Sequence, residues 1–205
     1  MTKRKRIKKM HIVKRTRFNR DLFRYLLNKI YSCRLKISGS NKVAFPSCVM
    51  LELTNLCNLH CTTCPRQYAY GKAMDKGCMP LDKAKKIVDE IYPYLDSIGL
   101  TGLGETFLYP HLTEIASYIK SKKKSIVVSL STNANLPNFV EKVKSVLPYI
   151  DTIQVSLDGI GDIYEQIRVD AKFDDMVENI KSVLPLTRKY HVDLMFNVVI
   201  TKENY

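Results

Sequence analysis

Three cysteines in the run CNLHCTTC carry the clearest chemical signal in the sequence. Cys57, Cys61 and Cys64 follow a C-x3-C-x2-C spacing, which places three thiols within eight residues. Thiolates are the usual protein ligands of iron–sulfur clusters, and three of them can bind one side of a cluster without completing a four-ligand shell. On a four-iron cluster this leaves one iron open to a small molecule. The spacing therefore indicates a redox metal site with an open position.

Other uses of these cysteines make different demands on the sequence. A disulfide framework is typical of short secreted chains, whereas this chain has 205 residues and places half of its six cysteines in one run. A thioredoxin-like redox pair at Cys61 and Cys64 is the main local alternative. A zinc knuckle needs a second Cys/His pair at matching spacing, and the sequence shows none. Metal binding by the run is the favoured interpretation, and the remaining cysteines, Cys33, Cys48 and Cys78, are interpreted as buried or incidental.

The elements that must position this run alternate between strands and helices. Apolar runs predict strands at Val49–Leu53, Ser97–Leu103, Ser125–Ser131, Asp151–Leu157 and Val192–Thr201. Helical spacing predicts helices over Leu81–Leu95, Pro110–Lys122, Pro137–Leu147 and Phe173–Tyr190. Such alternation indicates βαβ units and a parallel sheet, wound as a barrel or a doubly wound sheet. We expect the strands to be apolar on both faces, as in buried parallel sheets.

Polar or glycine-rich segments follow each of the first four predicted strands. They are the Cys run, Gly102-Leu103-Gly104-Glu105, Ser131-Thr132-Asn133 and Ser156-Leu157-Asp158-Gly159. In a parallel α/β barrel the carboxyl ends of all strands share one rim, where active sites are built. We therefore expect these four segments to meet at one site.

With these segments in place, residues 47–201 resemble the radical S-adenosylmethionine (radical SAM) enzymes. The Cys run after the first strand and Gly-Glu after the second carry the resemblance, and ELTNLCNLHCTTCPR is most similar to the SPASM/twitch-like branch. The resemblance implies a partial (β/α) TIM-type barrel with five of the usual six parallel strands. The expectation is a chain truncated at its C-terminus, without the sixth strand or an auxiliary-cluster domain.

The resemblance also implies roles for individual residues. Cys57, Cys61 and Cys64 would hold a [4Fe–4S] cluster whose open iron binds S-adenosylmethionine. The residues implied in binding S-adenosylmethionine are Gly102, Gly104 and Glu105 at the methionine amino group, Asn133 near the cofactor, Ser156 near the ribose and carboxylate, Arg168 at the carboxylate, and Asn197 with Val199 near the ribose and adenine. A guanidinium can fork onto a carboxylate, and glycine lets the backbone approach a ligand closely.

Each of these polar residues also has a structural interpretation. Glu105 could favour the start of the next helix, and Asn133 could serve as a cap or turn residue. Arg168 could be a surface cation, and Asp158 is interpreted as a turn residue.

The activity implied by the resemblance is reductive cleavage of S-adenosylmethionine to a 5′-deoxyadenosyl radical. This radical would abstract hydrogen from a small-molecule, sugar or peptide substrate, with electrons from a donor such as flavodoxin or ferredoxin. One alternative is a tRNA- or RNA-modifying enzyme of the same superfamily, and another is an inactive iron–sulfur fragment. The sequence does not name the substrate.

The net charge of +13 is concentrated at the N-terminus. Residues 1–46 carry 15 Lys/Arg and one acid, Asp21, whereas residues 47–205 carry 18 Lys/Arg and 19 acids. We therefore separate a basic arm, residues 1–46, from a catalytic core, residues 47–205. Residues 1–17 are expected to be disordered, and an apolar stripe predicts an amphipathic helix over residues 18–36.

The basic arm allows three interpretations. Packing of its stripe on the barrel is the favoured interpretation, followed by binding to an anionic membrane surface and then by binding to nucleic acid. The last has the least support, because no RNA motif with interleaved aromatic residues accompanies the charge. With no long apolar run and no signal-peptide core, a cytoplasmic location is expected.

Overall fold

The computed structural model describes residues 20–205 of the chain. The chain divides into two compact units, Met1–Ala44 and Phe45–Tyr205. In the first unit the described residues form one helix, α1 (Arg20–Ser38), at the position of the predicted amphipathic helix. The tail predicted to be disordered, residues 1–17, lies outside the described residues.

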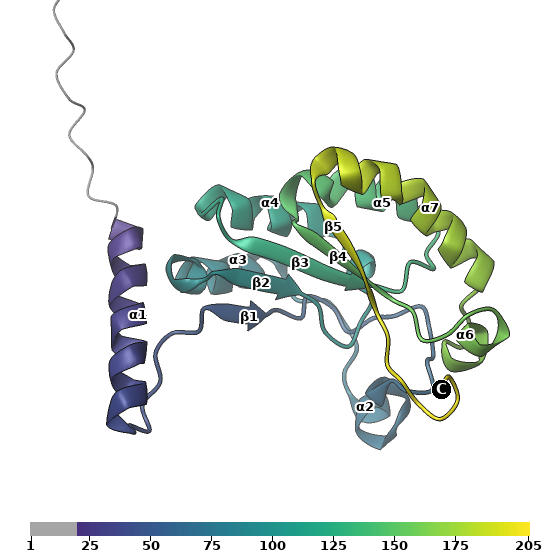
Figure 1. The fold of residues 1–205 in the computed structure, drawn as a ribbon, viewed down its shortest axis with the longest axis horizontal. Helices are drawn as coiled ribbons and strands as arrows, with labels where there is room; N and C mark the ends of the chain where they lie inside the picture. Colours follow the sequence, from purple (N-terminus) through teal and green to yellow (C-terminus); the bar gives the residue numbers. More distant parts are fainter. Residues whose placement is uncertain (1–19) are drawn as a thin grey trace, which may run out of the picture. The chain divides into compact units, whose positions relative to one another are not determined.

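Five parallel strands form a single sheet in the second unit (Figure 1). In chain order they are β1 (Cys48–Met50), β2 (Ser97–Leu100), β3 (Val127–Thr132), β4 (Thr152–Ser156) and β5 (Asp193–Asn197). Each strand pairs with the next one in parallel orientation. Consecutive parallel strands need a crossover after each strand, as in a TIM-type barrel. The predicted α/β fold, a partial parallel barrel, is confirmed.

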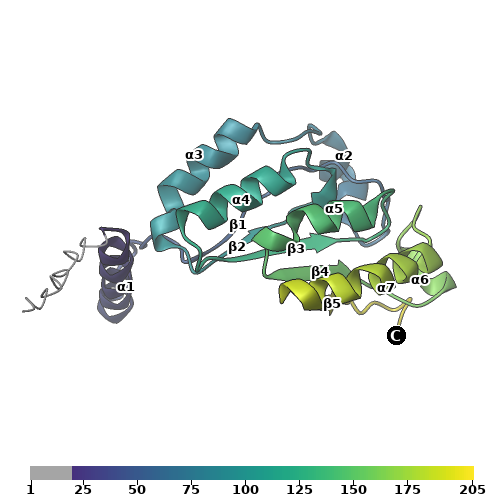
Figure 2. The ribbon, with the colours of Figure 1, turned by 90° about the horizontal axis from the view of Figure 1, so that it is seen from above.

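Four helices cover one face of this sheet (Figures 1 and 2), namely α3 (Leu81–Ile91), α4 (Leu112–Lys122), α5 (Phe139–Val146) and α7 (Phe173–Tyr190). Two predicted helices end early, in 3-10 turns at Tyr92–Tyr94 and Leu147–Tyr149. Each turn contains a proline, which has no N–H to continue the helical hydrogen bonds. None of the helices in residues 20–205 is long and apolar enough to cross a membrane.

Two short helices were not predicted, α2 (Ala69–Ala73) and α6 (Asp162–Ile167). At five and six residues they are too short to show a helical apolar period. Further 3-10 turns lie at Pro65–Gln67 and Thr106–Leu108. All four short elements lie on loops after strands, where a periodic pattern carries little information.

The two faces of the sheet differ in polarity, so the prediction of strands apolar on both faces is wrong. The helix-covered face is buried and mostly aliphatic, with Ile98, Leu100, Val128, Leu130, Ile153 and Val155. The open face is partly exposed and mostly polar, with Ser129, Ser131, Thr152, Gln154 and Ser156. The alternation arises because helices cover one face only, whereas runs apolar on both faces belong to sheets covered on both sides.

The edge strand β5 is more exposed than the strands inside the sheet. It pairs with β4, and Met195 and Phe196 are 52% and 51% exposed. The predicted strand Val192–Thr201 is longer than β5, and residues 198–200 continue without strand pairing. The helix-covered face therefore forms the core, while β5 contributes little to it.

Candidate metal centre

The three predicted thiol ligands lie on the loop between β1 and the 3-10 turn at Pro65–Gln67. Cys57, Cys61 and Cys64 are free and partly exposed. The charges of Cys57 and Cys64 both raise the pKa of Cys61. Burial has the larger effect, raising the pKa of Cys61 to about 11 and that of Cys57 above its ordinary value. Metal binding must therefore displace protons and supply compensating positive charge.

The arrangement of these thiols suits a cluster better than a single ion. Within residues 20–205, no three His, Cys, Asp or Glu side chains converge on a point where one metal ion could bind. A mononuclear zinc site requires such convergence. A four-iron cluster does not, because each thiolate binds a different iron. Three thiols on one loop thus fit a [4Fe–4S] cluster with one open iron.

Backbone hydrogen bonds hold the Cys loop on both sides. The N–H of Asn55 donates to the carbonyl of Gly77 at 3.2 Å, next to an antiparallel bridge between Thr54 and Cys78. On the other side, the N–H of Thr62 donates to the carbonyl of Ile167 at 2.8 Å. The N–H of His60 donates in the same way to Val169 at 3.1 Å. The segment after α6 thereby runs alongside the Cys loop and helps to fix its thiols.

Gly104 matters for packing of the Cys loop. A Cβ added at Gly104 would lie 2.3 Å from the carbonyl oxygen of Thr54 and 2.7 Å from that of Leu56. The next residue, Glu105, donates its N–H to the Leu56 carbonyl at 2.8 Å. Backbone can approach backbone this closely only where no side chain intervenes. Gly104 therefore lets the segment after β2 support the start of the Cys loop.

Gly102 lies against a different neighbour. A Cβ there would come within 2.3 Å of Glu52 Oε1, which accepts the N–H of Leu103 at 2.5 Å. Glu52 lies two residues after the end of β1. Gly102 thus faces the carboxyl end of β1, whereas Gly104 faces the loop that carries the cysteines.

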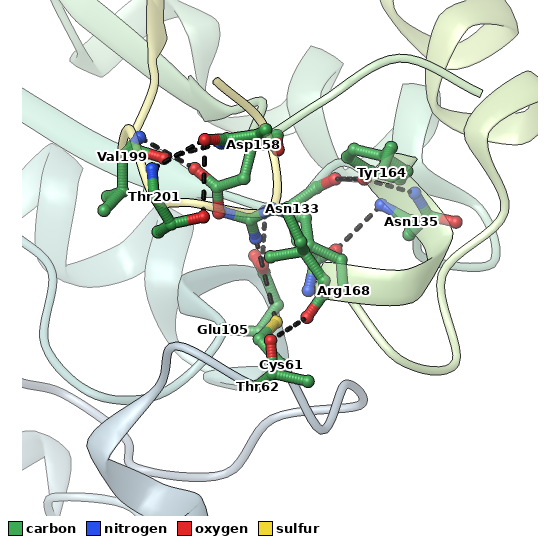
Figure 3. Close-up of polar contacts among 12 residues, drawn as sticks. Cys61, Thr62, Glu105, Asn133, Asn135, Asp158, Tyr164, Arg168, Val199 and Thr201 are labelled. Carbon is green, nitrogen blue, oxygen red and sulfur yellow. Dashed lines mark hydrogen bonds and ion pairs between the residues drawn. The ribbon is translucent and has the colours of Figure 1, made fainter. Parts of the chain in front are cut away.

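Glu105 is fully buried and ties the ends of β2 and β3 together (Figure 3). Its Oε1 accepts the hydroxyl of Thr132 at 2.9 Å and the N–H of Phe107 at 3.1 Å, and its Oε2 accepts the N–H of Asn133 at 2.7 Å. Burial raises the pKa of Glu105, while these bonds and the charge of Arg168 oppose the rise. Oε2 retains capacity for a second donor.

Asn133 joins Glu105 to the Cys loop. Its Nδ2 donates to Asn58 Oδ1 at 3.0 Å, and Asn58 lies inside the CNLHCTTC run. The following residue, Ala134, is buried and has φ of 56°, in the left-handed region that alanine rarely adopts. Asn135 continues the network, donating from Nδ2 to the hydroxyl of Tyr164 at 3.0 Å. The turn after β3 is thus strained and extensively hydrogen-bonded, as at many functional sites.

Arg168 reaches the Cys loop from the segment that follows α6 (Figure 3). Its Nη2 donates to Asp158 Oδ2 at 2.7 Å, and its Nη1 donates to Cys61 Sγ at 3.9 Å. The charge of Arg168 lowers the pKa of Cys61, although burial outweighs it. Nε of Arg168 is buried without a hydrogen-bond partner among residues 20–205. One guanidinium donor is therefore left without an acceptor among the described residues.

Ser156 and Asn197 are neighbours at the ends of β4 and β5. The sheet register pairs them, and the N–H of Leu157 donates to the carbonyl of Asn197 at 2.9 Å. Asp158 Oδ1 accepts the N–H of Val199 at 2.9 Å, so the same carboxylate binds both Arg168 and the segment after β5. The structure thus contains three linked pairs of predicted site residues, Cys61 with Arg168, Glu105 with Asn133, and Ser156 with Asn197.

Sequence reasoning gave too little weight to some of the residues that link these pairs. Asp158 was interpreted as a turn residue, yet it is 1% exposed and forms a buried ion pair. Its position two residues after the end of β4 was the available signal. Tyr164 lies on the unpredicted helix α6, and Asn58 was hidden among the cysteines. Cys33, Cys48 and Cys78 are exposed, so they are not the buried residues that the sequence suggested as one alternative.

Comparison with known proteins gives an independent view of this site. A family model described as the radical SAM superfamily matches residues 51–204. The subtilosin biosynthesis protein AlbA of Bacillus subtilis is 28% identical over 133 residues, 64% of this chain and 29% of AlbA. The AdoMet-dependent heme synthase of Methanosarcina barkeri is 32% identical over 116 residues, 56% of this chain and 32% of that enzyme. The chain spans about a third of the length of these curated relatives.

Solved structures with the same fold include SuiB of Streptococcus suis bound to its precursor peptide SuiA. It superposes with a TM-score of 0.64 at 20% identity, covering 86% of this chain and 38% of SuiB. SuiB bound to S-adenosylmethionine superposes with a TM-score of 0.63, also at 20% identity, covering 86% of this chain and 39% of SuiB. At this level of identity the likeness shows a shared fold.

Proposed function

Because the chain belongs to the radical SAM superfamily, we propose that it binds a [4Fe–4S] cluster and S-adenosylmethionine and takes a hydrogen atom from a peptide substrate. The superfamily uses both cofactors. Similarity to AlbA and SuiB agrees with the predicted SPASM/twitch-like branch. The observation that carries the proposal is the meeting of the Cys loop with the buried Arg168, whose Nη1 lies 3.9 Å from Cys61 Sγ.

The residues of the chain would hold and orient these cofactors. When bound, the cluster and S-adenosylmethionine supply the one-electron chemistry. Cys57, Cys61 and Cys64 bind the cluster, and Arg168 offsets negative charge at Cys61. The free Nε of Arg168 donates to the carboxylate of S-adenosylmethionine, and Glu105 Oε2 accepts from its amino group.

The remaining predicted residues complete the proposed cofactor site. Asn133 holds the Cys loop through Asn58, a contact of 3.0 Å. Ser156 and Asn197 lie side by side at the strand ends and are proposed to bind the ribose. Gly102 and Gly104 allow the backbone after β2 to lie close to β1 and the Cys loop.

The open face of the sheet favours a neutral, polar substrate. Its central side chains are hydroxyls and an amide, from Ser129, Ser131, Thr152 and Gln154. These groups donate and accept hydrogen bonds, as a peptide backbone requires. None of the five described strands contains Lys or Arg, the residues that would pair with the carboxylates of a tetrapyrrole. A peptide, such as the precursor peptide bound by SuiB, therefore fits this face better than the heme named for the Methanosarcina barkeri synthase.

Anaerobic reconstitution tests the cofactor assignment. We expect about four iron and four sulfide per chain, and reductive formation of 5′-deoxyadenosine from S-adenosylmethionine. Cys57→Ala, Cys61→Ala and Cys64→Ala should each lose the cluster, whereas the exposed Cys33→Ala and Cys48→Ala serve as matched controls. An intact four-iron absorbance in all three loop variants contradicts the assignment.

Deuterium transfer tests the substrate class separately. The reconstituted protein is incubated with peptides from a perdeuterated protein digest or with deuterated protoporphyrin, and 5′-deoxyadenosine is analysed by mass spectrometry. Deuterium gained from the peptides alone supports the proposal. Deuterium gained from the porphyrin alone contradicts the peptide assignment but leaves the cofactor assignment standing.

A further inference from the structure

Helix α1 carries an apolar stripe of exposed side chains, and the exposed Leu27 and Tyr31 lie beyond one edge of it. At about 100° per residue, five large apolar side chains fall within an arc of about 100° around the helix axis. Their exposed fractions are 54% for Leu22, 46% for Phe23, 49% for Leu26, 59% for Ile30 and 82% for Ile37. Side chains of this size are normally buried in soluble proteins. The stripe is therefore suited to contact an apolar phase or an apolar partner.

Cations border this stripe on both sides. At the same spacing, Lys29 and Lys36 lie beside one edge and Arg34 beside the other, whereas the acid Asp21 lies on the opposite side of the helix. The preceding segment, residues 1–19, adds nine Lys/Arg and no acid. Long basic side chains beside an apolar stripe can bury their methylene groups while their charged ends reach toward anions.

The combination of an apolar stripe with bordering cations distinguishes between two kinds of anionic partner, nucleic acid and lipid. Nucleic acid is bound through phosphates and does not require a continuous aliphatic stripe on the binding helix. An anionic lipid surface uses both features, because the stripe enters the boundary between headgroups and acyl chains and the cations meet the phosphates. We propose that α1 binds an anionic membrane surface, with the stripe of Leu22, Phe23, Leu26, Ile30 and Ile37 toward the lipid.

The geometry of α1 agrees with a helix that lies in the plane of the membrane surface. Its 19 residues span about 28 Å along the axis, and Asp21, Arg24 and Asn28 lie with Leu35 on the side opposite to the stripe. The same charges that favour the surface disfavour crossing the bilayer, and α1 does not qualify as a membrane span. The proposal is independent of the cofactor assignment.

Two leucines on opposite sides of α1 provide a matched test. Leu26 lies in the stripe, and Leu35, nine positions later, lies about 180° away around the helix. The full chain is sedimented with phosphatidylcholine vesicles containing 30% phosphatidylglycerol or none. We expect binding to the anionic vesicles, roughly tenfold weaker partitioning for Leu26→Ser, and partitioning within about twofold of the original chain for Leu35→Ser. Raising NaCl from 0.1 to 0.5 M should also weaken binding.

Several outcomes overturn the proposal. Equal binding to neutral and anionic vesicles would show that the cations of α1 do not drive binding. Equal losses of vesicle binding in the two leucine variants would show that the stripe does not contact the lipid. Binding of tRNA that excludes vesicles and is unchanged by Leu26→Ser indicates a general polyanion site instead. Absence of vesicle binding together with a dimer that Leu26→Ser dissociates, seen by sedimentation velocity, assigns the stripe to a second copy of the chain. Circular dichroism checks that both variants keep the helix.

Discussion

Replacing Arg168 with methionine removes the cation from a buried ion pair and leaves Asp158 behind. The two side chains are 11% and 2% exposed and meet at 2.7 Å. Removing one partner of a buried pair costs about 3–5 kcal/mol, because the remaining charge has lost both water and its partner. Asp158 keeps the hydrogen bond from the N–H of Val199 at 2.9 Å, which places the expected loss near the lower end, about 3 kcal/mol.

A double-mutant cycle measures this pair directly. Urea unfolding of the cluster-free chain is compared for the original sequence, Arg168→Met, Asp158→Asn and the double variant. The double variant should lose less stability than the two single losses added together, by about 2 kcal/mol, since it leaves no buried charge. Lys172→Met is the matched control, because its ion pair with Glu165 is exposed and should matter little.

The reasoning about this pair is refuted if Arg168→Met unfolds with nearly the same free energy as the original chain. An additive cycle would also contradict it, because independent losses mean that the two charges do not stabilise each other in the folded state. A large loss in Lys172→Met would show that the measurement does not distinguish buried from exposed pairs.

Three further predictions concern the surroundings of the Cys loop. Gly104→Ala should lower the iron content after reconstitution, because a Cβ at this position would lie 2.3 Å from the Thr54 carbonyl oxygen. Gly77→Ala should leave the iron content unchanged, because a Cβ at Gly77 would meet no atom within 4 Å. Glu105→Ala should lower the free energy of unfolding in urea by about 3 kcal/mol or more, because it leaves three buried donors unpaired. Glu105→Gln should lower it less, because Oε1 still accepts from two of these donors. Burial raises the pKa of Tyr164 from 10.0 to about 12, so between these two values the folded chain keeps a proton that the unfolded chain loses. The free energy of unfolding should therefore fall between pH 10 and 12. In Tyr164→Phe this part of the pH dependence should be absent.

Each of these predictions has an outcome that speaks against it. Equal iron contents for the two glycine variants would mean that the loop accommodates a side chain at position 104. Glu105→Gln as unstable as Glu105→Ala would show that the carboxylate charge, rather than its hydrogen bonds, holds the strand ends together. Parallel stability curves for the original chain and Tyr164→Phe above pH 10 would remove the argument about the tyrosine proton.

Much of the fold was predictable because local patterns and tertiary structure agree. Helix α7 begins and ends at the predicted residues, Phe173 and Tyr190, and its core residues follow helical spacing through Met176, Ile180 and Val183. All five strands were placed, although each is shorter than predicted, β1, β2 and β5 most clearly. Strand length depends on neighbouring chains that supply hydrogen bonds, and an apolar run does not report where those neighbours end.

The polarity of the sheet was mispredicted for a related reason. Ile153 and Val155 alternate with Thr152, Gln154 and Ser156 along β4, a period of two that indicates one covered face. The prediction gave more weight to the apolar residues than to this alternation. The open polar face, and with it the proposed substrate preference, became apparent only in the assembled sheet.

The sequence by itself determined the proposed donor set, the strand–helix order and the placement of a polar segment after each of the first four strands, because these depend on residue type and spacing along the chain. Only the tertiary structure decided which residues meet. Arg168 contacts Cys61, 107 positions away, and Glu105 bonds to Asn133 across two strands. These contacts depend on the register of the sheet and on the path of the segment after α6, which are set by packing of the whole core. The loop that can hold a cluster is therefore readable from eight residues, whereas the surroundings that tune it exist only in the folded chain.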